Sequence, residues 1–213
     1  MAATLPDGTR VFLGTGFSAE KTVSSITNAK PAKATSTAHG LNDGEYFTLK
    51  SGWQDLNERV FRVAAKDVNT FDVQGSDTVD VARYPVGQGA GSLVAVTGWT
   101  QITQVLSFEM SGGDQQFSTF SFLEEDFERE LPTVTSARSI SIGIADDPTA
   151  LGQIALQALE GKKVTRPLRL ELPNGSVLVY NGVVSFNSTP SLSKGEVMQV
   201  TASFSLAGRP TRL

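Results

Sequence analysis

Clustered carboxylates are the residues of this 213-residue chain that come nearest to a chemical site. Five acids crowd into seven consecutive positions: Glu124, Glu125, Asp126, Glu128 and Glu130. Paired carboxylates hydrolyse glycosidic bonds when they flank the bond from opposite sides. Acids this close together repel one another and hydrate, so we expect a solvated hairpin tip here rather than a catalytic pair. The spacing also differs from that of an EF-hand calcium loop.

Other residue types that carry chemistry are scarce. The chain has no Cys and a single His, His39, which excludes disulfides, cysteine nucleophiles and clusters of His or thiolate ligands. His39 precedes Gly40 and is interpreted as a turn residue rather than a general base. The Gly-rich stretches at 14–16 and 87–91 lack the context of a phosphate-binding loop. We therefore predict no catalytic residue, no cofactor and no metal site.

Charge is distributed unevenly along the chain, whose net charge is −4. Residues 97–147 hold nine acidic and two basic residues, whereas residues 148–213 hold three acidic and seven basic residues. Opposite fields steer copies of such a chain toward one another, although two solvated faces without a partner are the alternative. There is no basic stripe interleaved with aromatic residues, which argues against tight DNA binding. No signal peptide and no membrane-spanning run is visible.

Most of the chain is predicted to form short antiparallel strands. Pro173-Asn174-Gly175 separates two apolar runs, which is typical of a hairpin. Residues 196–207 alternate between apolar and small polar side chains, which predicts a strand with one buried and one wet face. The polar members are Gln199, Thr201, Ser203 and Ser205, and Ser139 and Ser141 alternate with isoleucines in the same way. Further strands are expected near 9–13, 104–110 and 117–123.

One amphipathic helix of about 13 residues is predicted between Pro148 and Gly161. Its apolar side chains recur at helical spacing, and we expect them to pack on a sheet: Leu151, Ile154, Ala155, Ala158 and Leu159. Asp146 and Asp147 are candidate N-caps.

Residues 23–96 are interpreted as a small β domain inserted between residues 1–22 and 97–213, which form one discontinuous domain. A loop-like stretch rich in Ser, Thr and Lys leads to a turn at 39–44. Strands are expected near 45–49, 58–66, 69–73 and 79–84, and the segment 87–92 is expected to be a flexible exit linker. Insertions of this kind occur at exposed loops.

Three stretches of the C-terminal half carry a family resemblance: ALGQIALQALEG, RPLRLELPNGSVLVYNGVVSF and SKGEVMQVTASFSLAGRPTRL. They resemble the tail tube (major tail) proteins of bacteriophages with long, non-contractile, lambda-like tails. The Pro-Asn-Gly hairpin and Gly208-Arg209-Pro210 are the most specific parts, and the resemblance extends weakly through residues 97–147. It implies a mainly β fold in which two antiparallel sheets pack around a core with one flanking α-helix. The 23–96 domain departs from the simplest family pattern.

The resemblance also implies a function. The protein would be a structural, non-enzymatic subunit of the virion tail, made in the host cytoplasm, that assembles with itself into stacked hexameric rings and meets other tail proteins at the tube ends. The inner sheets would join into one barrel through which double-stranded DNA passes during ejection. The wall of that barrel would carry Gln199, Thr201, Ser203, Ser205, Ser139 and Ser141. These side chains are uncharged, so they would not bind the phosphates of DNA.

The acidic hairpin is then expected to contact basic residues of a neighbouring subunit or of the next ring. The candidates are Lys162, Lys163, Arg166, Arg169, Lys194, Arg209 and Arg212. The competing interpretation places the acids on the lumen wall, and the sequence leaves both open. Residues 1–8 and 207–213 are interpreted as extended arms that either lace adjacent rings or fray.

Two other functions remain open at this point. The leading alternative is a two-domain β carbohydrate-binding module that stacks sugars on Trp53, Tyr46 or Trp99, and a carboxylate-based hydrolase is the third. The 23–96 domain is interpreted as an outward decoration, which is either a passive spacer or a contact with glycans of the host surface.

Overall fold

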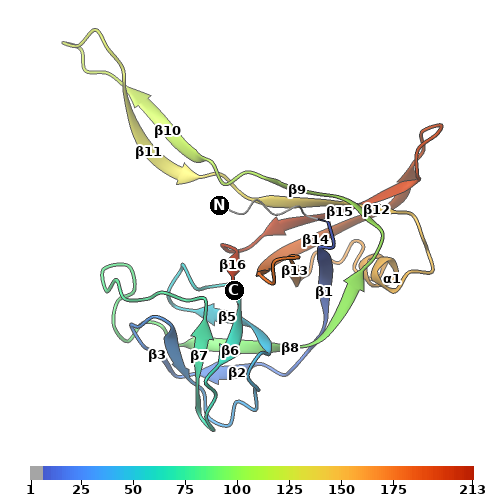
Figure 1. Ribbon diagram of the computed structural model, residues 1–213. Helices are drawn as coiled ribbons and strands as arrows, with labels where there is room; N and C mark the ends of the chain where they lie inside the picture. The colour runs from blue at the N-terminus through green and yellow to red at the C-terminus, as the bar shows by residue number, and fades with distance from the viewer. Residues whose placement is uncertain (1–6) are drawn as a thin grey trace.

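The computed structural model describes residues 7–213 and shows an antiparallel β protein with one short helix (Figure 1). The elements are β1 Arg10–Phe17, β2 Lys21–Val23, β3 Ser25–Ile26, β4 Ala32–Thr35, β5 Tyr46–Ser51, β6 Arg59–Ala64, β7 Thr70–Gln74, β8 Gly91–Ile102, β9 Val105–Ser111, β10 Gln115–Phe120, β11 Arg129–Thr135, β12 Ser139–Ala145, α1 Leu151–Gln157, β13 Thr165–Glu171, β14 Val177–Ser191, β15 Gln199–Leu206 and β16 Thr211–Arg212. The expected mainly β fold with one helix is confirmed. Most of the arm expected at residues 1–8 lies outside the described residues.

Fourteen strands form one continuous, curled sheet, and β10 and β11 form a separate two-stranded hairpin. The strand order of the large sheet is β3-β4-β7-β6-β5-β8-β1-β13-β14-β15-β12-β9, with β16 on β14 and β2 on β8. The twelve-residue strand β8 pairs with β5 through its first half and with β1 through its second half. One strand therefore carries the sheet from residues 23–96 into the rest of the chain, across the boundary predicted at residues 96 and 97.

Buried apolar side chains gather in two large clusters. One cluster lies in the β1–β13–β14–β15–β12 region under α1 and includes Leu13, Ile142, Leu168 and Phe204. The other lies within residues 23–95 and includes Phe47, Phe61, Phe71 and Trp53. A third, smaller cluster joins them and contains Tyr46, Val60, Val96 and Val179. Residues 23–95 thus have a core of their own that is packed against the rest of the molecule.

Local sequence signals place several elements correctly. The Pro173–Gly175 turn connects β13 to β14, with Gly175 at a φ of +81° and the Ser176 amide donating to Asn174 Oδ1 at 2.9 Å. In β15 the side chains of Val200, Ala202 and Phe204 are buried, as the alternation predicts.

Other expectations are wrong. The strand expected at 79–84 is a turn in which the Tyr84 amide donates to the Asp80 carbonyl, and the Tyr84 ring packs on Trp53. The stretch before His39 that was expected to be a loop contains β3 and β4, and β2 ends at its first residue, Val23. The expected flexible linker at 87–92 ends inside β8. The expected C-terminal arm is held within its own chain, because Leu213 and Val177 exchange two backbone hydrogen bonds of 2.8 and 3.0 Å.

The helix is shorter than predicted, and its buried face only partly matches the predicted one: Leu159 is buried and Ala155 packs against the core, as expected, but the other members of the stripe are exposed. Leu151 is 75% exposed and Ile154 is 46% exposed, whereas Gly152, Gln153 and Leu156 are buried. Gly152 lies so close to β8 that a Cβ there would come within 2.7 Å of the Gln101 carbonyl oxygen. Gln153 is held from both ends, since its Nε2 donates to Asp146 Oδ1 and its Oε1 accepts from the Asp147 amide. Neither aspartate caps α1, whose N-cap is Ala150.

Candidate assembly surfaces

A band of small polar side chains crosses four neighbouring strands, β14, β15, β12 and β9. Residues directly opposite one another in antiparallel strands share a face of the sheet. The register gives three such rows across the four strands: Ser185–Ser203–Ser141–Glu109, Val183–Ser205–Ser139–Ser111 and Asn187–Thr201–Gly143–Ser107. We call this face the polar wall. All six side chains that the sequence offered for a lumen belong to it, because Gln199 follows the same alternation at the end of β15.

Contacts within the polar wall are specific. The hydroxyl oxygens of Ser111 and Ser139 lie 2.7 Å apart across β9 and β12. Gly143 makes room for its neighbours, since a Cβ there would lie 2.5 Å from Gln199 Nε2 and 2.6 Å from Ser107 Oγ. The three rows contain one acid, Glu109, and no Lys or Arg. The wall is therefore wettable and offers no cation to a phosphate.

Sequence reasoning missed part of this wall. Glu109, Ser111, Ser185 and Asn187 join it only through strand pairing, which the sequence does not reveal. The alternation of Val105, Ser107 and Glu109 was the available signal for β9, but nothing in it indicated which strand lies beside β9.

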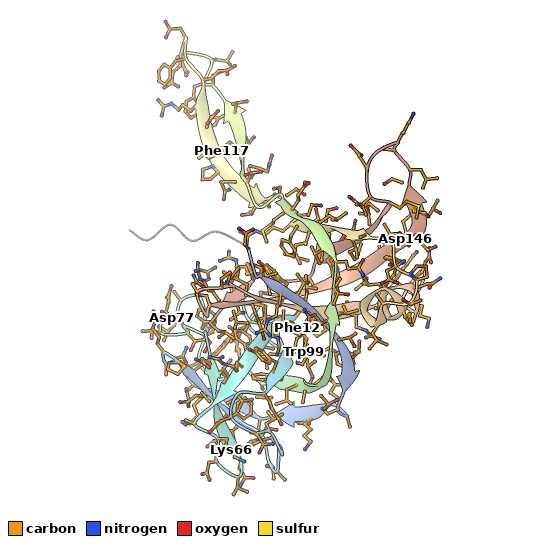
Figure 2. The ribbon with its side chains drawn as sticks, turned by 45° about the vertical axis from the view of Figure 1, so that its right-hand side comes forward. Phe12, Lys66, Asp77, Trp99, Phe117 and Asp146 are labelled. Carbon is orange, nitrogen blue, oxygen red and sulfur yellow. The ribbon has the colours of Figure 1, made fainter. Side chains whose placement is uncertain are left out.

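The β10–β11 hairpin projects away from the rest of the molecule, and Phe117 lies along it (Figures 1 and 2). Its exposed large apolar side chains are Phe117, Phe122, Leu123, Phe127, Leu131 and Val134. A two-stranded ribbon is only marginally stable in water by itself, and Phe117 and Leu131 lie on opposite faces of this one, because Phe117 pairs with Pro132 and Leu131 with Ser118.

The tip of this hairpin is internally organised. Arg129 forms an ion pair with Glu125, and its guanidinium lies 5.0 Å from the Phe127 ring centre and 5.6 Å from that of Phe122. The other tip acids, Glu124, Asp126, Glu128 and Glu130, are exposed. Leu123 is fully exposed at the end of the ribbon. The tip therefore presents an apolar point surrounded by negative charge.

The seven basic candidates do not form one patch. Lys162 and Lys163 are exposed just after α1, and Lys194 is exposed on the β14–β15 connection. Arg166 is half-buried with its guanidinium 4.8 Å from the Phe17 ring centre. Arg209 lies 3.7 Å from Asp55, and Arg212 is exposed on β16.

Arg169 is engaged inside the chain. Its guanidinium lies 4.5 Å from the ring centre of Phe12, 4.7 Å from that of Trp99 and 5.3 Å from that of Tyr46, and it pairs with Glu171 at 3.1 Å. Figure 2 shows Phe12 and Trp99 at this junction between the two parts of the molecule. Arg169 thus joins the two cores of one chain rather than standing free for a neighbour.

The aromatic residues offered for sugar stacking are largely occupied. Trp53 is 2% exposed and Tyr46 is 7% exposed. Trp99 is half-buried, with Arg169 over its ring and Tyr46 against it. His39 is also buried: its Nε2 lies 2.8 Å from the Asp67 carbonyl oxygen and its Nδ1 accepts from the Leu41 amide at 3.0 Å. These side chains hold the fold together and present no sugar-binding platform.

A charged cluster fastens the C-terminal strand to residues 55–83. Arg83 hydrogen-bonds Asp55 and holds the pKa of that carboxyl below its usual value, against the opposing effect of partial burial. Arg59 donates to the Asp55 carbonyl, to the Pro210 carbonyl and to Thr211 Oγ1. Burial lowers the pKa of Arg59.

Two features are absent from residues 7–213. No group of three or more His, Asp or Glu side chains is placed to hold a metal ion, and no helix in that range is long and apolar enough to cross a membrane.

Comparison with protein families gives one finding. The model of a family described as phage tail tube protein, TTP, matches residues 51–213, which is more than half of the chain. The match begins at the end of β5, inside the segment that the sequence suggested as an insertion, and includes both the polar wall and the hairpin. No curated protein matches the chain.

Proposed function

Because the chain belongs to the phage tail tube protein family, whose members are structural subunits of the virion tail that assemble into a tube with other tail proteins, we propose that its copies form stacked hexameric rings around a DNA channel. The six-fold count and the lambda-like type of tail rest on the sequence resemblance. The passage of double-stranded DNA rests on the polar wall.

The observation that carries the proposal is a polar sheet with two open edges. Strand β9 ends the strand order, so among residues 7–213 no strand pairs with its outer side. On the opposite side, β13 pairs with β14 only as far as Val183, which leaves the outer edge of residues 185–191 uncovered by β13. Pairing of β9 in one copy with this part of β14 in the next would close a barrel and remove both edges.

The polar wall suits a channel for DNA. Tight binding to a duplex depends on Lys and Arg contacts to phosphates, and the three rows of the wall supply none. Glu109 adds a negative charge in each copy. A wall of hydroxyls, amides and carboxylates stays hydrated and lets the duplex slide.

We propose that residues 23–96 form a passive lobe on the outside of the tube, inserted into the domain of residues 1–22 and 97–213. Its large aromatic side chains Phe47, Phe61 and Phe71 are fully buried, so they maintain its own core. We favour this role over a glycan contact, because the described surface offers no exposed Trp or Tyr platform on this lobe.

Negative-stain electron microscopy of the purified protein at rising concentration tests the proposal. Rings and hollow tubes are expected, with a central channel wide enough for a duplex. A monomer at every concentration, together with binding to a glycan array, would instead establish the carbohydrate-binding alternative. A carboxylate hydrolase would reveal itself by turnover that a single Glu-to-Gln change abolishes.

A further inference from the structure

A small basic pocket lies where the base of the β10–β11 hairpin meets the segment that follows β15. It has a volume of about 240 Å³ and is lined by Thr135, Ser136, Ala137, Arg138, Leu206, Ala207, Gly208 and Arg209. No acidic residue is among the residues that line it. Two of them belong to Gly208-Arg209-Pro210, a sequence to which the tube proposal gives no role.

The positive charge of this pocket is only partly neutralised by the chain. Arg138 forms no ion pair within residues 7–213. Arg209 lies 3.7 Å from Asp55, but Arg83 already hydrogen-bonds that carboxylate. Arg59 acts on the same carboxylate as well, so three guanidinium groups share one negative charge. An added anion beside Arg138 and Arg209 would therefore be stabilised.

The pocket also offers hydrogen-bond donors without acceptors. Among residues 7–213, the backbone amides of Gly208 and Arg209 donate no hydrogen bond. Ser136 Oγ accepts from the amides of Gly113 and Asp114 at 2.9 and 3.0 Å, which leaves its hydroxyl hydrogen for another acceptor. Successive backbone N–H groups are a recurring means of binding anions in proteins. The donors and the two cations thus call for the same kind of ligand.

Close packing holds both sides of the pocket in place. A Cβ on Gly113 would lie 2.6 Å from Arg138 Nε, so the Arg138 side chain lies directly against the hairpin base. A Cβ on Gly208 would lie 2.9 Å from Arg59 Cγ and 3.1 Å from the Glu58 carbonyl oxygen, so the other side is packed on the 23–96 lobe. A preorganised pocket loses less conformational freedom when a ligand binds.

The size of the pocket limits the ligand to a small ion. Its volume is below the roughly 300–1,000 Å³ of pockets that hold drug-sized molecules. Guanidinium groups form paired, charge-assisted hydrogen bonds with the oxygens of phosphate. Phosphate near neutral pH also carries more negative charge than chloride or a single carboxylate, and it has enough oxygens for both arginines and the backbone amides.

We propose that this pocket binds a free phosphate ion, held by Arg138, Arg209 and the amides of Gly208 and Arg209. The bound ion connects the hairpin base to the segment after β15 and, through Gly208, to the 23–96 lobe. This inference is independent of the tube proposal, because every residue of the site belongs to one chain.

Titration of the purified protein with inorganic phosphate, followed by the phosphorus NMR line width of the ion, measures binding directly. Saturable broadening with a Kd of about 1 mM is expected. Arg138→Gln and Arg209→Gln should each weaken binding roughly tenfold, because each removes one charge-assisted donor pair. The matched control is Arg212→Gln, which removes the same charge from an exposed position on β16 and should leave the Kd within about twofold of the unmodified value.

Thermal unfolding supplies a second measurement. Phosphate at ten times its Kd should raise the Tm by roughly 3–5 °C through binding to the folded state, whereas chloride at equal ionic strength should not. Phosphate also stabilises proteins in general by exclusion from their surface, so the comparison with Arg138→Gln decides: the increase should shrink in this variant and persist in Arg212→Gln.

Two results would overturn the site. One is equal binding by the unmodified protein, Arg138→Gln and Arg209→Gln. The other is displacement of phosphate by a short DNA duplex at equal phosphate concentration, which would place a nucleic-acid backbone in the pocket instead. If Arg138→Gln fails to fold, Arg138→Lys keeps the charge and removes the planar donor pair, and it should bind phosphate several-fold more weakly; unchanged binding by this variant would also overturn the proposal.

Discussion

The guanidinium carbon of Arg169 lies 4.7 Å from the centre of the Trp99 ring, at the junction of the two cores. The rings of Phe12 and Tyr46 also contact this guanidinium, and Glu171 forms an ion pair with it. A residue whose charge suggested a contact between subunits is instead a joint within one subunit.

Replacement of this joint should destabilise the fold. We expect Arg169→Ala to lower the free energy of unfolding by about 2 kcal/mol, because it removes several cation–π contacts and the packing of the Arg stem. Urea unfolding followed by Trp fluorescence measures the change. Arg212→Ala, at an exposed position on β16, is the control and should change stability by less than about 0.5 kcal/mol; equal effects of the two variants would contradict the role given to Arg169.

The base of the projecting hairpin depends on Gly112. Its φ is +77°, and a Cβ there would lie 1.9 Å from the Ala137 carbonyl oxygen. Gly112→Ala should therefore cost more than the roughly 1–2 kcal/mol of left-handed backbone strain alone. Gly175→Ala is the matched control, because Gly175 has a φ of +81° and no atom within 4 Å of its added Cβ. Thermal unfolding of both variants compares their losses of stability. Similar losses would show that the backbone at Gly112 shifts away from the Ala137 carbonyl at little cost.

Acid should weaken the cluster around Asp55. Arg83, then Arg209 and Arg59, hold the pKa of Asp55 below its usual 3.8. A depressed folded pKa gives stability that is present above the unfolded pKa and is lost as pH falls through the folded value. Asp55→Asn should therefore cost about 1 kcal/mol near neutral pH and less than that below pH ~4. Urea unfolding across a pH series measures this, with the exposed Asp114→Asn as control; a cost independent of pH would refute the linkage.

Cations on the polar wall should turn the proposed channel into a DNA-binding surface. Tubes carrying Ser141→Lys and Ser203→Lys should bind a short duplex with an affinity that falls steeply with salt. Val81→Lys with Val86→Lys adds the same charge at exposed positions of the 23–96 lobe and should bind more weakly. Fluorescence anisotropy of a labelled duplex distinguishes them, and equal binding by both double variants would place the wall away from the path of DNA.

Elements specified by neighbouring residues could be predicted from the sequence. The turn between β13 and β14 follows from the tolerance of Asn and Gly for their backbone conformations, and the two faces of β15 follow from strict alternation. The turn and the alternation are both local properties, which do not depend on which neighbouring strand the segment pairs with.

Elements decided by distant residues could not be predicted. The first turn of α1 is oriented by Gly152 against β8 and by the two hydrogen bonds of the Gln153 side chain, which leave Leu151 and Ile154 exposed. The position of Arg169 depends on rings contributed by β1, β5 and β8. The extent of the polar wall depends on which strands pair, and residues 79–84 turn because Tyr84 packs on Trp53.

Strand β8 also has a mechanical consequence. Its first half belongs to the sheet of the 23–96 lobe and its second half to the sheet that carries the polar wall. Neither core can unfold without withdrawing half of a strand from the other, so heat or tension on one core is transmitted to both. The 23–96 lobe and the sheet of the polar wall should therefore melt in one cooperative transition, and force applied to the lobe reaches that sheet along the backbone of β8.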